Sequence, residues 1–581
     1  MTALNDYFQS PQHHAQKQYE AVRAFIVEHQ SAEQVAKQFG YTPATIYWLV
    51  KDFKQKLAKQ ELDHYLFSTL KPGRNKKQNA ESLQEKIVAL RKQYLSVEEI
   101  KAHLDTQNDR ISETYIYQTI KATGFARLPR RSKLAKQDIQ STITIDAPKT
   151  EILTEEKESF NTSNIGLLCF LPIIQAYELD ALIENSSYPE TKTLPRLHSI
   201  LSFVALKLSN IKRYTKDDLW CMDRGLGLFA GLNVLPKAAW FSSYSHRVTR
   251  EMNMDFLRAL HQLWVKQGLL SDTVNLDFTT LPCWGDDAHL EKNWSGTRHK
   301  ALSSILAAIA QDPESGLLTH GDANVQQSTE SETVIEFLDF YKANGDDNLK
   351  YLVFDSKFTS YENLKKLDER NIKFVTIRRR GQKIVSELEQ LPSSAWQKVR
   401  VMAGDGKKRL LKVCDQKIIL RNYGQKEIRQ LAIMGHGRIK PALIITNDFT
   451  LTKADIIRKY AQRWIVEKSI AEQTHFFHLN RLSSSMVIKV DFDLTMTIFA
   501  YNLYRLLAQM LSRYSHQTAE KLYDKFISNA GQVKIDDDTI NVLMKKKRHL
   551  PAMLSAMKQL VPCKISWIAD KKINISAATH S

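Results

Sequence analysis

The hydrophobic pattern of the chain changes at residue 272, and this change constrains the fold more than any other feature. From there the apolar residues predict three strands, a helix, a strand, a helix and a further strand. The second and third strands, within residues 299–325, are joined by the turn DPESG, in which Asp-Pro and Gly favour a hairpin. This order of elements predicts a mixed sheet with helices packed on it.

Two aspartates stand on the predicted strands. Asp277 lies inside the first strand, DTVNLDFTTLP, and Asp355 ends the strand KYLVFD. A carboxylate beside a buried strand costs free energy unless a positive charge compensates it. Either aspartate alone is better explained by a strand-end cap or an ion pair. Two aspartates on neighbouring strands repel each other unless a divalent cation lies between them, and oxygen ligands suit Mg²⁺ or Mn²⁺.

The predicted helix ADIIRKYAQRWIVEKSIAEQ supplies a candidate for a third carboxylate. Tyr460, Arg463 and Glu467 occupy positions i, i+3 and i+7, so they share one helix face. The alternative is a surface ion pair between Arg463 and Glu467, which contributes only about 0.3–0.5 kcal/mol. Glu472 is a rival carboxylate, but at five residues from Glu467 it is expected to point elsewhere.

The pattern Y-x-x-R-x-x-x-E formed by these three residues resembles the signature of the insertion-sequence DDE transposases, in particular insertion-sequence family four and its relatives. The surroundings of Asp277 in NLDFTTLP and of Asp355 in YLVFDSKFTSYENLKKL resemble those of the two aspartates of that family. The resemblance covers roughly residues 196–512. It implies an α/β RNase H-like catalytic domain with a β-rich insertion, here at about residues 381–447.

The resemblance also implies a reaction and its site. The chain would be a DNA transposase that binds the terminal inverted repeats of an insertion sequence, cleaves the ends and transfers the 3′-OH ends to target DNA. Asp277, Asp355 and Glu467 would be the catalytic residues and would bind two Mg²⁺ (or Mn²⁺) ions. Tyr460 and Arg463 would hold the DNA backbone near the cut, where the planar guanidinium suits phosphate. A homodimer would pair the two DNA ends.

One position departs from the family pattern. The family usually has Lys seven residues after the glutamate, whereas this chain has Thr474. Lys468, which we also assign to the DNA backbone near the cut, His475 and His478 are the alternative sources of that positive charge. Two other functions remain open: an inactive transposase-derived DNA-binding regulator, and a metal-dependent DNA nuclease without strand transfer.

Residues 31–53 predict a helix-turn-helix. Ser31 is a helix cap, Gly40 follows the first helix where a stop needs positive φ, and Pro43 begins the second helix. An ordinary helical hairpin is the alternative. The residues expected to bind DNA are Thr42, Thr45, Tyr47 and Lys51.

A second helical segment repeats this logic and resembles a winged helix-turn-helix. Ser112 caps its last helix, whose outward residues are expected to be Tyr115, Gln118 and Lys121. Arg130 and Arg131 follow in a basic tail. The linker between the two modules carries Arg74, Lys76 and Lys77, which either follow a DNA groove or are simply solvated.

Composition agrees with a nucleic-acid partner. Lys and Arg number 82 against 64 Asp and Glu, so the net charge is 82 − 64 = +18, which favours an anionic partner, with nucleic acid the leading candidate. The partner that the resemblance implies is double-stranded DNA. The five cysteines are far apart without a CxxC pair, which argues against a zinc finger or a disulfide framework and fits a reducing cytosol. No secretory signal is visible, and polar residues interrupt the apolar stretch 494–511, which therefore predicts a buried helix rather than a membrane span. We expect a cytoplasmic, nucleoid-associated prokaryotic protein.

These inferences predict a multidomain chain with all-α modules, a helical middle region and a helical C-terminus around the catalytic domain. The expected order is a helix-turn-helix module in 1–70, a basic linker in 71–80, a second module in 81–137, a linker in 138–163, a helical region in 164–270, the catalytic domain in 271–512 and a helical region in 513–581.

Overall fold

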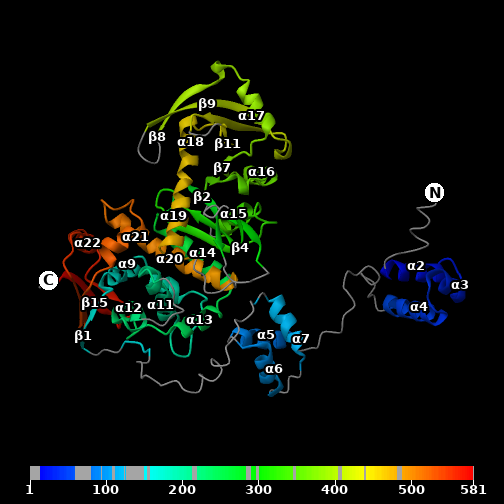
Figure 1. Cartoon of the computed structure of the whole chain (residues 1–581), viewed down its shortest axis with the longest axis horizontal. Coiled ribbons are helices and arrows are strands. Elements are labelled where there is room, and N and C mark those ends of the chain that lie inside the picture. Colours follow the sequence, from blue (N-terminus) through cyan, green and yellow to red (C-terminus); the bar gives the residue numbers. More distant parts are fainter. Residues whose placement is uncertain are drawn as a thin grey trace. The chain divides into compact units, whose positions relative to one another are not determined.

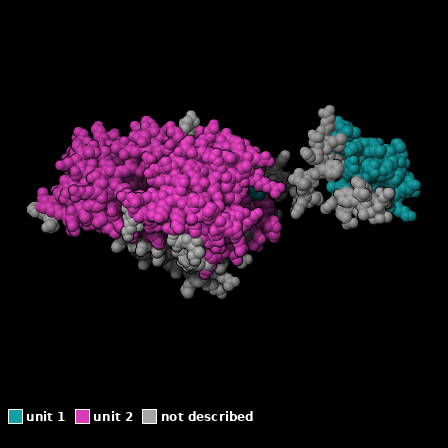
Figure 2. Space-filling view, turned by 90° about the horizontal axis from the view of Figure 1, so that it is seen from above, with its two compact units in different colours: residues 1–84 teal, residues 85–581 magenta. Residues whose placement is uncertain are grey.

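A computed structural model shows a chain that mixes helices and sheets in two compact units, residues 1–84 and 85–581 (Figure 2). The described residues are 14–58, 80–92, 95–106, 111–123, 125, 150–153, 157–211, 219–282, 290–295, 300–343, 348–402, 408–436, 440–479 and 487–579.

The described part of unit 1 contains three complete helices, α2 (His14–Ile26), α3 (Ala32–Phe39) and α4 (Pro43–Ala58), and the first residues of a fourth that begins at residue 80. The expected cap is present, because the Ser31 hydroxyl accepts from the Gln34 amide and the Gln34 side chain accepts from the Ser31 amide. Gly40 ends α3 at φ +65°, a left-handed conformation that favours glycine. Buried apolar side chains such as Val35 and Ile46 hold α3 against α4.

A second set of helices begins with the segment at the boundary between the units. It comprises α5 (Ala80–Lys92), α6 (Val97–Thr106) and α7 (Glu113–Ala122). Buried isoleucines and leucines of the three helices form one small core. The Ser112 hydroxyl accepts from the Tyr115 amide and so caps α7 as expected. The wing predicted after α7 and the basic residues Arg74, Lys76, Lys77, Arg130 and Arg131 lie outside the described residues.

The residues from 273 onward build a ten-stranded sheet within the described chain. Its strands are β2 (Thr273–Pro282), β3 (Lys292–Ser295), β4 (Lys300–Gln311), β5 (Leu318–Val325), β6 (Tyr351–Phe354), β7 (Lys373–Ile377), β8 (Gln397–Met402), β9 (Lys408–Ile419), β10 (Glu427–Met434) and β11 (Ala442–Thr446). The order is β3-β4-β2-β6-β7-β11-β10-β9-β8, with β5 also paired to β4. The central strands β2, β6 and β7 are parallel, whereas β4 and β5 form the expected antiparallel hairpin.

Helices cover both faces of this sheet (Figure 1). On one face α15 (Thr333–Ala343) and α16 (Tyr361–Glu369) pack on the even-numbered residues of β2 and β6. On the other face α18 (Lys453–Gln462) packs on β7 to β11. The segment predicted as a β-rich insertion contains β8 to β11 and also α17 (Gln382–Glu389). Because β11 pairs with β7, these strands continue the central sheet rather than forming a sheet of their own.

The remaining helices form the largest apolar core of the described chain. They are α9 (Phe170–Ala176), α10 (Leu179–Glu184), α11 (Arg196–Leu208), α12 (Arg224–Phe229), α13 (Ala238–Ser245), α14 (Arg250–Lys266), α19 (Trp464–His475), α20 (Val487–Met510), α21 (Ala519–Leu522) and α22 (Leu550–Met557). Single-turn segments are η2 (Ile165–Cys169), η3 (Leu219–Met222), η4 (Ser356–Phe358), η5 (Ser393–Ala395), η6 (Arg421–Tyr423) and the π-helical η7 (Tyr523–Ile527).

The prediction of a helical C-terminal region is wrong. Residues 513–581 contain β12 (Gly531–Ile535), β13 (Thr539–Met544), β14 (Cys563–Ile565) and β15 (Lys571–Ala577). Together with β1 (Glu158–Thr162) they form a sheet in the order β1-β12-β13-β15-β14. The alternation of buried Ile540, Val542 and Met544 with half-buried neighbours is the period-2 signal of these strands.

The linker predicted for residues 138–163 is also wrong at its end. Residues 158–162 form β1, which pairs with β12 over its whole length. The sequence ESFNT is polar and carries little apolar alternation. Its place in the sheet depends on backbone hydrogen bonds to a strand that lies far away in the sequence, so the local pattern does not reveal it.

The apolar stretch 494–511 lies in α20, which is buried as predicted. The polar side chains that interrupt it bond to backbone groups of other elements. Asn502 donates to the Leu318 carbonyl and accepts from the Leu318 amide, at 2.9 and 2.8 Å. Gln509 donates to the Ser315 carbonyl. No helix in the described residues has both the length and the apolar character that a membrane crossing requires.

Asn502→Ala is expected to lower the free energy of unfolding by roughly 2–4 kcal/mol, because it leaves two buried backbone groups of Leu318 without partners at about 1–3 kcal/mol each. Urea unfolding of the full chain measures the change. Gln509→Ala is the matched control on the same helix, since Gln509 is exposed and makes one such bond. Equal effects of the two variants would contradict the assignment.

Candidate functional site

The odd-numbered residues of β2 face the helix pair α18 and α19. Val274 and Leu276 point into the core under α15 and α16, so the residues between them point to the opposite face. Three of these side chains bond to successive positions along the helical segment: Thr273 to Lys459 at 2.9 Å, Asn275 to the Gln462 carbonyl at 3.1 Å, and Asp277 to Arg463 at 2.8 Å. This ladder of contacts fixes Asp277 opposite the junction of the two helices.

Asp355 lies beside Asp277. In the parallel pairing of β2 with β6, Leu276 is opposite Phe354, and both side chains point into the same core. The next residues are Asp277 and Asp355. Their side chains therefore project from the opposite face of the sheet, on neighbouring backbone segments that are about 4.8 Å apart. The Ser356 amide donates to the Asp355 carboxylate at 2.7 Å, which holds this side chain at the end of β6.

Arg463 connects Asp277 with Glu467. Its guanidinium donates to the Asp277 carboxylate at 2.8 Å and to the Glu467 carboxylate at 2.6 Å. The Arg463 side chain is 12% exposed and that of Asp277 is 15% exposed. This arrangement differs from the simple surface pair considered as the alternative, because one cation bridges a strand and a helix.

The continuous helix predicted for this region is broken at Arg463. The residue ends α18 and precedes α19, and the backbone there makes tight i→i−3 bonds from Arg463 to Tyr460 and from Val466 to Arg463. The guanidinium carbon lies 5.5 Å from the centroid of the Tyr460 ring. The shared helix face expected for Tyr460, Arg463 and Glu467 is thus preserved through contacts across a break.

The pKa of Asp277 reflects its burial and the charges around it. It is raised to about 6, chiefly by burial and additionally by the charges of Glu467 and Asp355, while Arg463 and the Phe278 amide oppose this shift. Burial lowers the pKa of Arg463, but Tyr460 and the carboxylates more than offset this and raise it. Burial raises the pKa of Tyr460 to about 12. The site therefore combines a buried anionic cluster with one fixed cation.

Comparison with protein families matches residues 270–503 to the transposase DDE domain. The match supports a transposase DDE domain over these residues, and we refer to them as the DDE domain. The resemblance to DDE transposases inferred from the residues is confirmed for this region, whereas the narrower assignment to insertion-sequence family four stays a prediction. A search of curated proteins found no match to the chain.

The residues considered as sources of the missing positive charge differ in their exposure and contacts. Lys468 is exposed, with its ammonium 5.5 Å from the centroid of the Trp464 ring, and Trp464 itself is 59% exposed. The Thr474 hydroxyl donates to carbonyls of its own helix. His475 is exposed, whereas His478 is buried and bonds to Asn210 at 2.6 Å. His478 is therefore occupied elsewhere and does not replace the missing lysine.

Glu472 is directed away from Asp277, as its place on the helix predicts. Its carboxylate accepts from the Ala519 amide at 2.7 Å, at the start of α21. Sequence reasoning missed Lys459, whose ammonium reaches Thr273 and lies 3.9 Å from the centroid of the Tyr351 ring. The sequence signal that could have identified Lys459 is its position directly before Tyr460 of the Y-x-x-R-x-x-x-E pattern.

The side chains of Asp277, Asp355 and Glu467 offer only oxygen atoms as ligands, which suits a hard divalent cation. Within the described residues, no group of three or more His, Cys, Asp and Glu side chains is gathered closely enough to hold a metal ion. Arg463 occupies the position between Asp277 and Glu467, and a cation that bound both would compete with it.

The two N-terminal modules present similar surfaces. The exposed and buried positions of residues 41–51 repeat at residues 111–121, so that Thr42, Tyr47 and Lys51 correspond to Ser112, Tyr117 and Lys121. In the first module Thr45 bonds to Thr42, and Tyr47, Lys51 and Phe25 line a hollow of about 540 Å³.

The second module corrects one prediction. Gln118 and Lys121 are exposed as expected, whereas Tyr115 is partly buried against the core of its module. Tyr117, at 45% exposure, points outward instead, as does its counterpart Tyr47. The reason is helical spacing, since Tyr115 lies one residue before the buried Ile116 and packs beside it.

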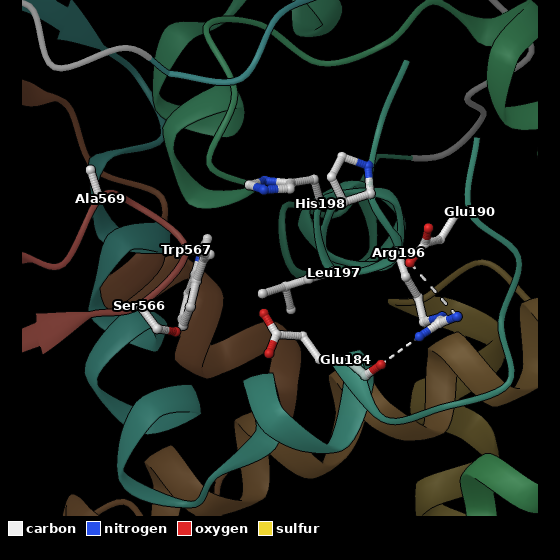
Figure 3. A pocket seen from close by; sticks show the side chains of 9 residues that line it. Glu184, Glu190, Arg196, Leu197, His198, Ser566, Trp567 and Ala569 are labelled. Carbon is white, nitrogen blue, oxygen red and sulfur yellow. Dashed lines mark hydrogen bonds and ion pairs between the residues drawn. The ribbon is translucent and has the colours of Figure 1, made fainter. Parts of the chain in front are cut away.

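A separate cavity of about 480 Å³ lies between α11 and the turn that precedes β15. Figure 3 shows the Glu184 carboxylate, the His198 ring and the Trp567 ring around it. His198 shares a hydrogen bond with the Ala230 carbonyl at 2.8 Å, and burial lowers its pKa. The cavity contains none of the residues predicted for catalysis or DNA binding.

Proposed function

We propose that the chain is a DNA transposase that binds the terminal inverted repeats of an insertion sequence, cleaves its ends and transfers the 3′-OH ends to target DNA. The observation that carries this proposal is the arrangement within the DDE domain. Asp277 lies within β2, Asp355 directly follows the neighbouring parallel strand β6, and Arg463 connects Asp277 to Glu467.

The topology supports an RNase H-like fold for this domain. The central strand β2 has an antiparallel hairpin on one side and the parallel strands β6 and β7 on the other. The helices α15 and α16 lie in the connections that lead to β6 and β7. This order places the middle of β2 beside the end of β6, which is where Asp277 and Asp355 lie.

Asp277, Asp355 and Glu467 would hold two Mg²⁺ or Mn²⁺ ions. Such ions would supply activation of the attacking oxygen and stabilisation of charge on the leaving oxygen of the phosphodiester. The mutual repulsion that helps to raise the pKa of Asp277 is the cost that bound cations would relieve. Asp277 and Asp355 are positioned by neighbouring strands of the sheet, whereas Glu467 lies on α19 and is held by Arg463.

Arg463 and Tyr460 would position the DNA. The guanidinium is already held in a fixed orientation by Asp277, Glu467 and the Tyr460 ring. A planar, preoriented fork of donors can grip two phosphate oxygens at once. Lys468 is exposed on the same helical segment and would add a nearby positive charge.

The N-terminal modules would recognise the DNA ends. Their exposed helix faces, with Tyr47 and Lys51 in one and Tyr117 and Lys121 in the other, would lie against the duplex. Two modules in one chain would read a longer site and raise affinity through their tether. A homodimer would hold two ends in one complex.

Strand transfer distinguishes this function from the alternatives. The purified chain with Mg²⁺ is expected to nick duplexes that carry the inverted repeats flanking its coding region, and to join precut ends to a plasmid. Sequencing of the joined products measures the transfer. Nicking without joining would indicate a nuclease, and binding without either reaction would indicate a regulator.

A further inference from the structure

The outer strands β8 and β9 have one covered face and one open face. On the covered face Val399, Val401, Leu411 and Val413 pack with Ile456 and Ile457 of α18. On the opposite face α17 packs on Cys414, Ala432 and Leu443, nearer the middle of the sheet. Beyond α17 this face remains open at the sheet edge. We call it the edge face, and its residues are Lys398, Arg400, Met402, Lys408, Leu410 and Lys412.

The edge face carries cations that lie opposite one another. Lys398 is directly opposite Lys412 in the strand pairing, and Arg400 lies one pair further along, opposite Leu410. Like charges directly opposite each other on a sheet are destabilising. Leu410 and Met402 are 56% and 60% exposed, so the face also shows apolar surface. An anionic partner bound to this face would offset the repulsion between these cations.

In the described part of the chain, the cations of the edge face lack the ion pairs that several neighbouring bases make. Within the described residues, the four cations Lys398, Arg400, Lys408 and Lys412 make no ion pair. Other bases of the same segment are paired: Lys417 with Glu427 at 3.2 Å, Lys426 with Asp368 at 2.9 Å, and Arg429 with Asp415 at 2.8 Å. The edge face therefore brings together, on two neighbouring strands, four cations without an ion pair to any described residue.

We propose that the edge face binds the phosphate backbone of duplex DNA. This proposal rests on the proposed function, since it assigns a further contact to the same DNA substrate. Cations at alternate positions of a strand are about 6.8 Å apart, and neighbouring strands are about 4.8 Å apart, so the face presents a two-dimensional array of charge. Lys and Arg at such spacing contact phosphates without regard to sequence, and the exposed Leu410 and Met402 would lie against the sugars.

The edge face has a fixed relation to the catalytic site. β8 and β9 are joined to β2 through the hydrogen-bonded strands β10, β11, β7 and β6. Figure 1 shows α18 running from this end of the sheet toward α19 and β2. DNA held on the edge face is therefore oriented relative to Asp277 by a continuous sheet.

The test compares two triple variants of the full chain that remove the same charge. The first is Lys398→Gln, Arg400→Gln, Lys412→Gln on the edge face. The control is Lys417→Gln, Lys426→Gln, Lys365→Gln, which removes exposed lysines that are already paired. Binding to a 40-base-pair duplex of arbitrary sequence is measured between about 50 and 200 mM salt. The edge-face variant is expected to bind about tenfold or more weakly, and its slope of log affinity against log salt is expected to fall by about 2–3.

A crosslink gives an independent readout. Leu410→Cys, labelled with a photoreactive group, is expected to crosslink to the duplex, with the unsubstituted chain as the labelling control. An unchanged salt slope of the edge-face variant, or crosslinks only to protein, would overturn the proposal. If the parent chain nicks and joins DNA while the edge-face variant binds normally, the proposed function stands and only the edge-face contact is wrong.

Discussion

Asp277→Asn is expected to abolish DNA nicking, with a loss of about a thousandfold or more, while binding of DNA ends changes less than about twofold. The substitution is nearly isosteric, and its carbonyl oxygen can still accept from the Phe278 amide at the position now used at 2.8 Å. What it removes is the negative charge that the proposed two-cation chemistry requires. The measurement is a single-turnover nicking assay alongside a gel shift on the same DNA.

The control for this variant is Asp415→Asn. Asp415 is also a strand aspartate paired with an arginine, Arg429, in the same sheet, but it lies on β9 away from Asp355 and Glu467. It is expected to keep nicking within a few-fold of the parent chain. Retained nicking by Asp277→Asn would remove Asp277 from the mechanism.

Arg463→Ala is expected to lower the maximal nicking rate by about a hundredfold or more, the order of loss seen when an oriented donor to developing charge is removed. The same change frees Asp277 and Glu467 from their shared counterion. Binding of Mn²⁺ to the chain, followed by calorimetry, is therefore expected to strengthen severalfold. Arg463→Lys is expected to restore little activity, because a single ammonium cannot span both carboxylates as the planar fork does.

Arg458→Ala is the matched control for Arg463→Ala. Arg458 lies on the same helix, is exposed, and pairs only with Asp455 within its own turn. Its loss is expected to change neither the nicking rate nor Mn²⁺ binding by more than about twofold. Weaker Mn²⁺ binding by Arg463→Ala would contradict the competition between guanidinium and cation.

Much of the DDE domain could be predicted from the sequence because its signals are local. The strand at residues 272–282 and the strand ending in Asp355 carry apolar runs with a single acid each, and parallel strands place such acids side by side. The cap at Ser31 and the stop at Gly40 were equally local, since each depends on one side chain or one φ angle.

The contacts that were missed depend on segments far apart in the sequence. The bond between Arg463 and Asp277 spans 186 positions, and the break between α18 and α19 that allows it leaves no glycine or proline signal. The polar strand β1 owes its conformation to β12, which lies more than 360 positions away in the sequence. Tertiary pairing decides each of these cases.

Because β11 pairs with β7, the inserted segment also covers what would otherwise be an exposed edge of the central sheet. Without β8 to β11, the backbone amides and carbonyls along one side of β7 would lie bare, ready to recruit another polypeptide. A chain that lacked the whole segment would therefore need another element to cover this side of β7. The insertion is as much a guard against aggregation as an added surface.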